Sequence, residues 1–354
     1  MSAAAAPLRI PVDALRDFIA RSLAATGMPG AHATTVAALM AEADLQGSDG
    51  HGVIRLAPYV RRIRHGGINL APDIRIVQER AATALVDGDN AMGHLVMSRA
   101  ARIAVDKART CGIAWVGSRL SNHAGPASLY ARMPLAVGMI GLYFAVGNAN
   151  HLPPWGGLEM LLSTNPIAAA IPAGEEPPIV LDMATTVAAY GKVKAKAQRG
   201  ESMPEGWMID RQGRPLTDPK RADEGFLLPI GGYKGYGLAL LVGLLAGTLN
   251  GAAMGRQVID FNKDEHSVTN TGQAIVAIDP AAFGDPAALR AEVDTLIRDL
   301  RNSEKMPGHE RIWLPGEQSH ARRIAYARDG IPLPAALVAS LATLAGELGV
   351  APLA

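Results

Sequence analysis

The feature that most constrains the fold of this chain is the absence of a dinucleotide-binding fingerprint. In 354 residues, no Gly-x-Gly-x-x-Gly segment opens a helix, and no Gly-x-x-x-x-Gly-Lys-Ser/Thr segment is present. These segments form the phosphate-binding turns of Rossmann and P-loop folds. Their absence argues against both folds, so any nucleotide must bind in a site of another kind.

Short apolar runs and helical stretches share the middle of the chain. The runs typical of strands are residues 84–87, 113–116, 139–146, 179–182 and 273–278. Apolar residues at helical spacing predict helices over residues 94–110, 124–136 and 234–249. The mixture predicts an α/β core with a mixed sheet, since the alternation is too irregular for a doubly wound one.

Both ends of the chain have helical patterns. Residues 11–25 and 31–45 predict a helical hairpin, and residues 286–302 and 334–348 predict two helices near the other end. A Gly- and Pro-containing passage at 66–72 is typical of a linker. We therefore expect a discontinuous helical domain, 1–70 plus 285–354, around an α/β core, 71–284. Residues 197–224 are polar and turn-rich, which predicts a long surface excursion.

Composition indicates an ordinary globular protein. Hydrophobic residues make up 49% of the chain and the formal net charge is +1, so no general field attracts nucleic acid or an anionic membrane. The single cysteine, Cys111, cannot form an internal disulfide and fits a reducing compartment. Neither a signal peptide nor an apolar stretch of membrane-spanning length is apparent, so we expect a cytoplasmic protein with no membrane partner.

His51, Arg55 and Tyr59 are spaced four residues apart. An imidazole can exchange a proton near neutral pH, and a guanidinium can hold a carboxylate with two hydrogen bonds. Reduction of a 2-oxo acid needs both groups. On one helix the three side chains would share a face. Because Gly50, Gly52 and Pro58 disfavour that helix, a helix that begins near Ala57, with His51 on the preceding loop, is an equal alternative.

Three other segments have small residues through which backbone amides could approach a pyrophosphate: 121–126, 182–186 and 231–235. His123 could face a nicotinamide, Asp182 could accept a hydrogen bond from a ribose or a carboxamide, and Lys234 could contact a phosphate. A helix cap for Asp182 and a solvated lysine remain open alternatives. We expect no metal site, because the nine histidines are scattered and no His-Glu-x-x-His occurs. A hydrolase is disfavoured because no Gly-x-Ser-x-Gly is present.

The order of these motifs resembles the type-2 malate/L-lactate dehydrogenase family, which includes ureidoglycolate and sulfolactate dehydrogenases, diketogulonate reductase and cyclic imino-acid reductases such as piperideine-2-carboxylate reductase. The resemblance covers about residues 11–331. The matching segments are Asp49-Gly50-His51-Gly52-Val53-Ile54-Arg55-Leu56, Ser121-Asn122-His123-Ala124-Gly125, Thr164-Asn165-Pro166-Ile167-Ala168, Leu181-Asp182-Met183-Ala184-Thr185, Gly191-Lys192, residues 228–238 and Leu314-Pro315-Gly316-Glu317.

The resemblance implies an oxidoreductase that uses NAD or NADP in a non-Rossmann fold, usually as a homodimer. It makes His51 the proton donor to the substrate carbonyl, with His123 as a second catalytic candidate. Arg55, Tyr59 and Thr164 would contact the substrate. The implied cofactor contacts are Asn122, His123, Ala124, Gly125, Pro126, Asp182, Met183, Ala184, Tyr233, Lys234, Pro315, Gly316 and Glu317.

Two departures from the family pattern bear on the substrate. Gly50 stands where many members have a serine before the histidine, and Lys192 stands where imino-acid reductases have a carboxylate. A Ser-His-Asp relay is therefore excluded, which favours a small 2-hydroxy or 2-oxo acid substrate. The alternatives are a reductase of cyclic or N-substituted 2-imino acids and a dinucleotide-binding sensor that has lost catalysis. The identity of the acid and the choice between NAD and NADP stay open.

Overall fold

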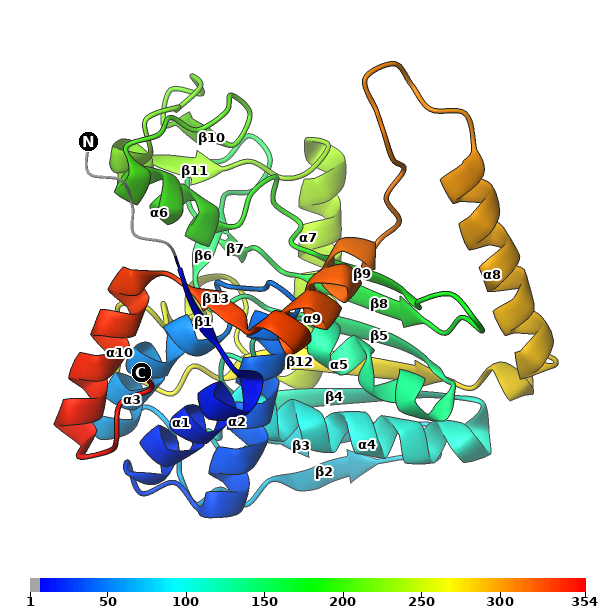
Figure 1. The fold of residues 1–354 in the computed structure, drawn as a ribbon, viewed down its shortest axis with the longest axis horizontal. Coiled ribbons are helices and arrows are strands. Elements are labelled where there is room, and N and C mark those ends of the chain that lie inside the picture. Colours follow the sequence, from blue (N-terminus) through cyan, green and yellow to red (C-terminus); the bar gives the residue numbers. More distant parts are fainter. Residues whose placement is uncertain (1–6) are drawn as a thin grey trace.

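A seven-stranded mixed sheet forms the centre of the molecule (Figure 1). The computed structural model describes residues 7–354, so residues 1–6 of the expected helical domain lie outside the described range. The strands lie in the order β2-β3-β4-β12-β5-β8-β9. Their bounds are β2 Arg75–Glu79, β3 Thr83–Asp87, β4 Ile113–Ser121, β5 Ile140–Ala145, β8 Ile167–Ile171, β9 Ile179–Met183 and β12 Thr271–Ile278.

The strand directions distinguish this sheet from a doubly wound one. Only β3 and β4 pair in parallel, and the other neighbours in the sheet are antiparallel. The connection between β3 and β4 is helix α4, Gly93–Cys111, which is the crossover that a parallel pair requires. The prediction of an α/β fold with a mixed, non-Rossmann sheet is confirmed.

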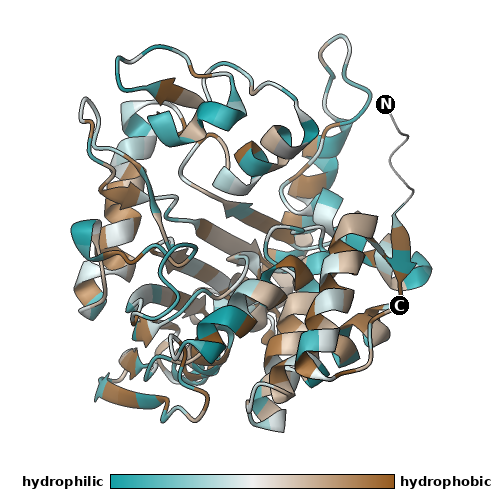
Figure 2. Ribbon diagram, turned by 90° about the vertical axis from the view of Figure 1, so that its left-hand side faces the viewer, coloured by the Kyte–Doolittle hydropathy of each residue, from teal (hydrophilic) through white to brown (hydrophobic). Residues whose placement is uncertain are grey.

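Two helices cover one face of the sheet. Alanines and Val96 of α4 pack with Leu129 of the short helix α5, Ser128–Ala131, over the inward side chains of β3, β4, β5, β8 and β12. Helix α7, Tyr233–Ala246, packs on β5 and β12 outside that core. Figure 2 shows hydrophobic residues along the central strands, as burial on both faces requires.

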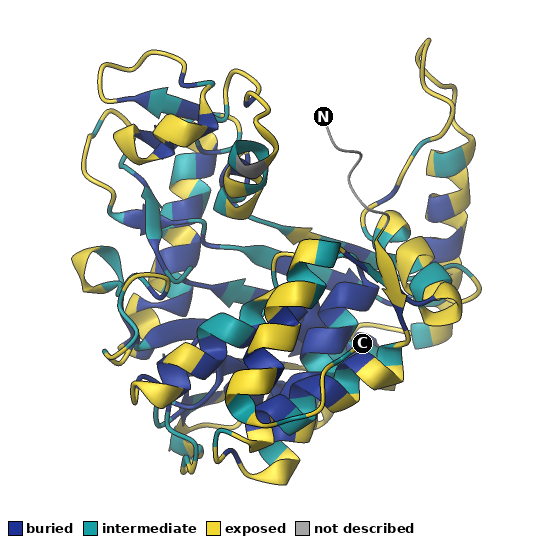
Figure 3. Cartoon of the chain, turned by 60° about the vertical axis from the view of Figure 1, so that its left-hand side comes forward, coloured by how far each residue is buried: buried dark blue, intermediate teal, exposed yellow. Residues whose placement is uncertain are grey.

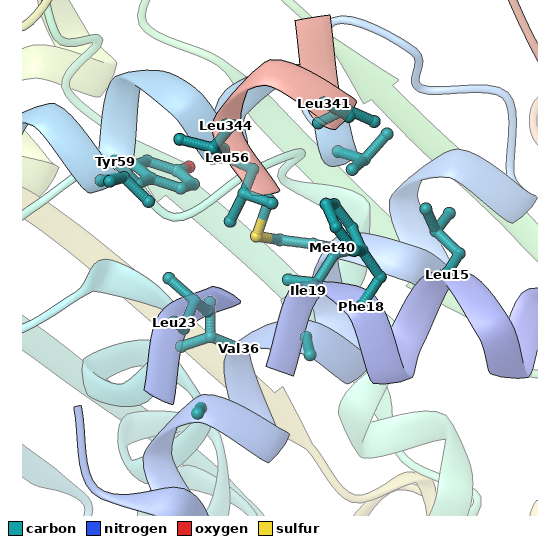
Figure 4. Packing of buried hydrophobic residues seen from close by; sticks show 14 of the residues in the cluster. Leu15, Phe18, Ile19, Leu23, Val36, Met40, Leu56, Tyr59, Leu341 and Leu344 are labelled. Carbon is teal, nitrogen blue, oxygen red and sulfur yellow. The ribbon is translucent and has the colours of Figure 1, made fainter. Parts of the chain in front are cut away.

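A second core holds together helices from both ends of the chain. It joins α1 Val12–Ala24, α2 Gly30–Leu45, α3 Leu56–Arg64 and α10 Ala335–Leu348, with β1 Leu8–Ile10 paired to β13 Ile331–Leu333. Figure 4 shows Phe18, Met40 and Leu341 in this core, with the ring of Tyr59 at its edge. Helix α3 is therefore anchored in this core by its own buried side chains. The division of the chain into two domains stays a prediction.

Helix α8, Pro286–Asn302, lies within the range expected for the helical domain, but its side chains Val293 and Ile297 pack near Ile171 and Ile179 at the ends of β8 and β9. The loop after α8 extends away from the body (orange in Figure 1) and is largely exposed in Figure 3. It leads into α9, Glu317–Asp329.

Two expected elements differ from the structure. The helix predicted over 124–136 is limited to α5 and a 3₁₀ turn, Met133–Val137, because residues 122–127 form an irregular loop with Gly125 at φ 80°. The expected excursion at 197–224 contains a strand and a 3₁₀ turn. The smaller elements between residues 150 and 227 are β6 Asn150–Leu152, β7 Leu162–Ser163, α6 Tyr190–Arg199, β10 Met208–Asp210, the 3₁₀ turn Pro219–Glu224 and β11 Gly225–Leu227. In the described range 7–354, no helix is long and apolar enough to cross a membrane.

Candidate active site

Three histidines and a tyrosine from separate parts of the chain meet beside the helical layer. The rings of His51 and His123 lie 5.5 Å apart and nearly parallel, with an interplanar angle of 9°. Tyr59 meets His94 edge-on at 5.7 Å, and Phe261 lies 5.7 Å from the ring of His123. Two of these residues, His51 and His123, are the catalytic candidates of the sequence, which the fold brings together across 72 positions.

Tyr59 makes a hydrogen bond to the ring of His123. Its hydroxyl lies 2.5 Å from Nδ1 of His123, while the backbone N–H of Gly125 approaches the same nitrogen at 3.4 Å. Burial raises the pKa of Tyr59 above its ordinary value, and burial lowers the pKa of His123 well below its own. Both partners are therefore neutral near pH 7, and Nε2 of His123 is left for a substrate.

The position of His51 follows from the end of helix α2. The chain turns after Leu45, His51 lies on the loop 46–52, and a 3₁₀ turn, Val53–Arg55, leads into α3 at Leu56. The loop alternative for His51 is thus the one observed, and Pro58 lies in the first turn of α3, where its missing N–H is tolerated. Burial, together with a smaller effect of the Arg55 charge, lowers the pKa of His51 to about 4.

The side chain of Arg55 lies beside this cluster of histidines. Its Nε donates to the carbonyl of Gly50 at 2.8 Å, and its Nη1 donates to Oδ1 of Asn262 at 3.2 Å. These two bonds fix the plane of the guanidinium but use only part of its five donors. The remaining donors can hold a carboxylate.

Sequence reasoning missed His94, Phe261 and Asn262. His94 is fully buried at the start of α4, and neither of its ring nitrogens has a partner among the described residues. Burial lowers its pKa to about 3, with a smaller effect from His51. Phe261 and Asn262 lie in a loop with no regular secondary structure, so no periodicity or motif marks them.

Hydrogen bonds around β9 bring the predicted cofactor segments together. The N–H of Ser128 donates to Asp182 at 2.8 Å, and the N–H of Val180 donates to the carbonyl of Pro315 at 3.0 Å. The N–H of Ile230 donates to the carbonyl of Thr185, which places the turn before Lys234 next to the end of β9. Segments separated by almost two hundred residues therefore meet at one edge of the sheet.

The substrate candidate Thr164 joins the same region. Its carbonyl accepts the N–H of Thr185 at 2.9 Å, and the N–H of Gly147 contacts the amide of the next residue, Asn165, at 3.2 Å. Thr164 thus lies between β7 and β8, beside the end of β9.

A cavity of about 100 Å³ lies between β9, the residues around α5, the end of α2 and the start of α9, and its lining does not include Thr164 or residues 231–235. Its lining includes Gln46, Ser128, Arg132, Asp182 and Gly316. Burial raises the pKa of Asp182 and lowers that of Arg132; the two side chains influence each other without forming an ion pair in the described structure. Nε of Arg132 is buried without a partner. A polar ligand that both donates and accepts hydrogen bonds fits this site, as a nucleotide ribose or carboxamide does.

Several predicted cofactor residues have side chains engaged elsewhere. The amide of Asn122 bonds to Asn90, Ala91 and Thr269. The carboxylate of Glu317 pairs with Arg301 at 2.6 Å and accepts the N–H of Leu314. Contacts from these two positions would therefore come from the backbone. By contrast, Tyr233 and Lys234 are exposed at the start of α7 and free to contact a ligand.

Across residues 7–354, no group of three His, Cys, Asp or Glu side chains has the geometry to hold a metal ion.

Comparison with known proteins gives consistent matches over nearly the whole chain. The malate/L-lactate dehydrogenase family matches residues 10–342. A malate dehydrogenase from Pyrococcus horikoshii is 37% identical over 97% of this chain and 96% of its own length. A ureidoglycolate dehydrogenase (NAD(+)) from Escherichia coli O157:H7 is 33% identical over 92% and 93% of the two chains. The solved structure of the Pyrococcus horikoshii malate dehydrogenase superposes with a TM-score of 0.89 at 35% identity, covering 98% and 97%.

Proposed function

Since the chain belongs to the malate/L-lactate dehydrogenase family and is a nicotinamide-dependent 2-hydroxy acid dehydrogenase, we propose that the cluster of His51, His123 and Arg55 is its catalytic centre. The reaction is the reversible interconversion of a small 2-hydroxy acid and its 2-oxo acid. The observation that carries this proposal is the convergence of two imidazoles and a guanidinium at one site, next to the cofactor segments.

His123 is the proposed acid–base group. The hydrogen bond to Tyr59 fixes its ring, as an orienting partner does for a general base. In oxidation, the proton of the neutral ring would lie on Nδ1 and be donated to the Tyr59 oxygen in place of the longer contact with the Gly125 N–H, so Nε2 can take the proton of the substrate hydroxyl. In reduction the same nitrogen returns the proton to the carbonyl oxygen. His51, which has no such partner, would donate a hydrogen bond to that oxygen.

Arg55 would hold the substrate carboxylate, with Thr164 on the flank of the same site. Its plane is set by Gly50 and Asn262 before substrate binds, so little side-chain entropy is lost on binding. A clamp of this kind recognises the carboxylate common to all 2-hydroxy acids. It leaves the rest of the acid to be selected by the shape of the cleft.

The residues around the end of β9 fit a nicotinamide dinucleotide, because Asp182 and Arg132 line one cavity and the Nε of Arg132 is buried there without a partner among the described residues. When bound, the nicotinamide supplies or accepts a hydride at C2 of the substrate. We propose NAD or NADP as the cofactor, with backbone contacts from residues 122–126, 182–184 and 315–317. Tyr233 and Lys234 add contacts at the start of α7.

A homodimer is the proposed assembly. Leu241, Leu244 and Leu249 on and after α7 are 52%, 43% and 64% exposed, which is unusual for leucines on neighbouring helical turns. Burial of this strip against a second copy would remove it from water. The single cysteine, Cys111, is free, which fits a reducing compartment. We therefore propose that the protein is located in the cytoplasm.

The test of the function is oxidation of NADH and of NADPH against a panel of 2-oxo acids, with and without methylamine. Turnover with the acid alone supports the dehydrogenase. Turnover that requires the amine would instead show a reductase of N-substituted 2-imino acids. Cofactor binding without turnover across the panel would support the sensor alternative and contradict the proposal.

A further inference from the structure

The carboxyl group of Asp44 lies beneath the loop that carries His51. Asp44 is the penultimate residue of α2 and is 3% exposed. Its Oδ2 accepts the backbone N–H of Val53 at 2.7 Å. This bond joins the end of one helix to the first residue of the 3₁₀ turn that leads to Arg55.

Gly52 allows this close approach. A Cβ atom at Gly52 would lie only 1.9 Å from Oδ1 of Asp44, a distance that no real pair of atoms adopts. The carboxyl group therefore lies directly against the backbone of residue 52. Because His51 precedes this contact and Val53 follows it, the contact sets the path of the chain on both sides of the imidazole.

Backbone hydrogen bonds hold the rest of the loop in place. The N–H of Ser48 donates to the carbonyl of Ala43, and the N–H of His51 donates to the carbonyl of Ser48. The N–H of Arg55 donates to the carbonyl of Gly52 at 2.9 Å. The backbone of Gly52 thus packs against the carboxyl group of Asp44, and its carbonyl accepts the N–H of Arg55. These contacts link the position of the guanidinium to the same carboxyl group.

We propose that Asp44 is a positioning residue that fixes His51 and Arg55 in register with His123. The proposal rests on the catalytic roles given above to His51 and Arg55. Asp44 touches neither substrate nor cofactor in this account, and it acts only through the backbone of residues 52 and 53.

The surroundings of Asp44 indicate which substitution should preserve this function. Burial, opposed by the hydrogen bond from the Val53 N–H and assisted by the charge of Asp49, raises the pKa of its carboxyl group to about 7. Arg322 faces Asp49 across the loop. The site thus accepts a neutral side chain, provided that an oxygen remains for Val53. Asparagine meets this condition and alanine does not.

The test compares Asp44→Asn, Asp44→Ala and Gly52→Ala in the full-length enzyme. Asp44→Ala and Gly52→Ala should each lower kcat/KM about 30- to 100-fold and raise KM for the 2-oxo acid, while the Kd for NADH, measured by fluorescence, stays within twofold. Asp44→Asn should keep kcat/KM within about threefold. The double variant Asp44→Ala/Gly52→Ala should be no worse than either single variant, since both remove the same contact.

Asp294→Ala is the matched control. Asp294 is also a buried aspartate, and it accepts the backbone N–H groups of Gly174, Glu175 and Glu176 far from the histidines. Its loss should destabilise the protein and leave kcat/KM per folded molecule unchanged. If Asp44→Ala keeps kcat/KM within twofold, or if Asp44→Asn is as impaired as alanine, the positioning role is wrong. If Asp44→Ala does not fold, the contrast between Asp44→Asn and Gly52→Ala decides. Full activity of Arg55→Ala would instead contradict the proposed function.

Discussion

The hydroxyl of Tyr59 lies 2.5 Å from Nδ1 of His123, inside a site where Tyr59 is fully buried and His123 is half-buried. This contact gives His123 an orienting partner, which His51 lacks. In the proposed mechanism Tyr59 would therefore position His123, whereas the sequence predicted a substrate contact for Tyr59. Its hydroxyl would support the proposed acid–base group from the side opposite the substrate.

Removal of this hydroxyl should slow the reaction with little effect on substrate binding. We expect Tyr59→Phe to lower kcat about tenfold, since a neutral hydrogen bond contributes about 0.5–1.5 kcal/mol. KM should change by less than twofold because Arg55 is untouched. Steady-state kinetics measure both values. Tyr143→Phe, at a second buried tyrosine, is the control and should keep the wild-type kcat. A large change in KM for Tyr59→Phe would place its hydroxyl on the substrate instead.

The two histidines should respond differently to substitution and to pH. His123→Asn should lower kcat by about 10²- to 10⁴-fold, as expected for loss of a general acid–base, and His51→Asn by roughly tenfold. Because burial lowers the pKa of His123 below 6.5, the neutral form that oxidation needs persists at acidic pH. The kcat/KM of oxidation should therefore stay level from pH 8 to below pH 6.

Initial rates of 2-hydroxy acid oxidation between pH 4.5 and 9 test this expectation. Reduction needs the protonated ring, so its rate should instead fall as the pH rises. A midpoint of the oxidation profile at pH 6.5 or above would mean that His123 is not the titrating base. A larger loss for His51→Asn than for His123→Asn would reverse their assignment.

Arg55 should be needed mainly for the carboxylate. Arg55→Ala should reduce kcat/KM by about 1–3 kcal/mol in transition-state terms, with a raised KM, because a charge-assisted bond is lost. Arg55→Lys should recover only part of this, since an ammonium cannot form the planar fork. Arg61→Ala, which removes an exposed α3 arginine paired with Glu265, is the control. An unchanged KM for Arg55→Ala would remove this side chain from the site.

Much of the fold could be predicted wherever a buried helix face produces a periodic pattern of apolar residues in the sequence. Helices α1, α2, α8 and α10 each bury one stripe of apolar side chains, so their extents follow from spacing. Helix α9 has no buried residue and therefore leaves no such period, and it was missed. The helix expected at 124–136 is short because the chain first places the N–H of Ser128 on Asp182, which is a tertiary constraint.

The residues of the candidate site also divide into those that a sequence pattern marks and those that none marks. His51, Arg55 and His123 belong to motifs with an ordered pattern and could be proposed from sequence. His94 and Asn262 have no motif, since they enter the site through packing and through one loop contact. The roles of Asn122 and Glu317 could not be separated from cofactor binding without coordinates, because only the structure shows that their side chains are already bonded.

The cavity at the end of β9 should contribute to cofactor binding. Arg132→Met keeps much of the side-chain length and removes the buried guanidinium. We expect it to raise the Kd for NADH about 10- to 100-fold, since a hydrogen bond to a charged group contributes about 1.5–3 kcal/mol. Quenching of protein fluorescence measures this Kd without turnover. Arg102→Met is the control, because Arg102 lies on the sheet-covering helix α4 and bonds to Ser98. A Kd within twofold of wild type would show that the cofactor does not use this cavity.

Burial of His94 should make the protein less stable in acid. Its pKa is about 3 in the folded protein and about 6.5 when unfolded, so below pH 6.5 the unfolded state binds a proton that the folded state does not. The free energy of unfolding should therefore fall as the pH drops below 6.5, by about 2 kcal/mol at pH 5 from this residue alone.

His94→Leu removes this proton-binding group and replaces two unpartnered nitrogens with an apolar side chain. Its free energy of unfolding, measured in urea, should fall about 2 kcal/mol less than that of wild type between pH 7.5 and pH 5. At pH 7.5 the two proteins should be similar, because no hydrogen bond within the described structure is lost. His309→Leu, in the exposed loop before α9, is the control and should keep the wild-type slope. Parallel pH profiles for His94→Leu and wild type would show that His94 is not buried in its neutral form.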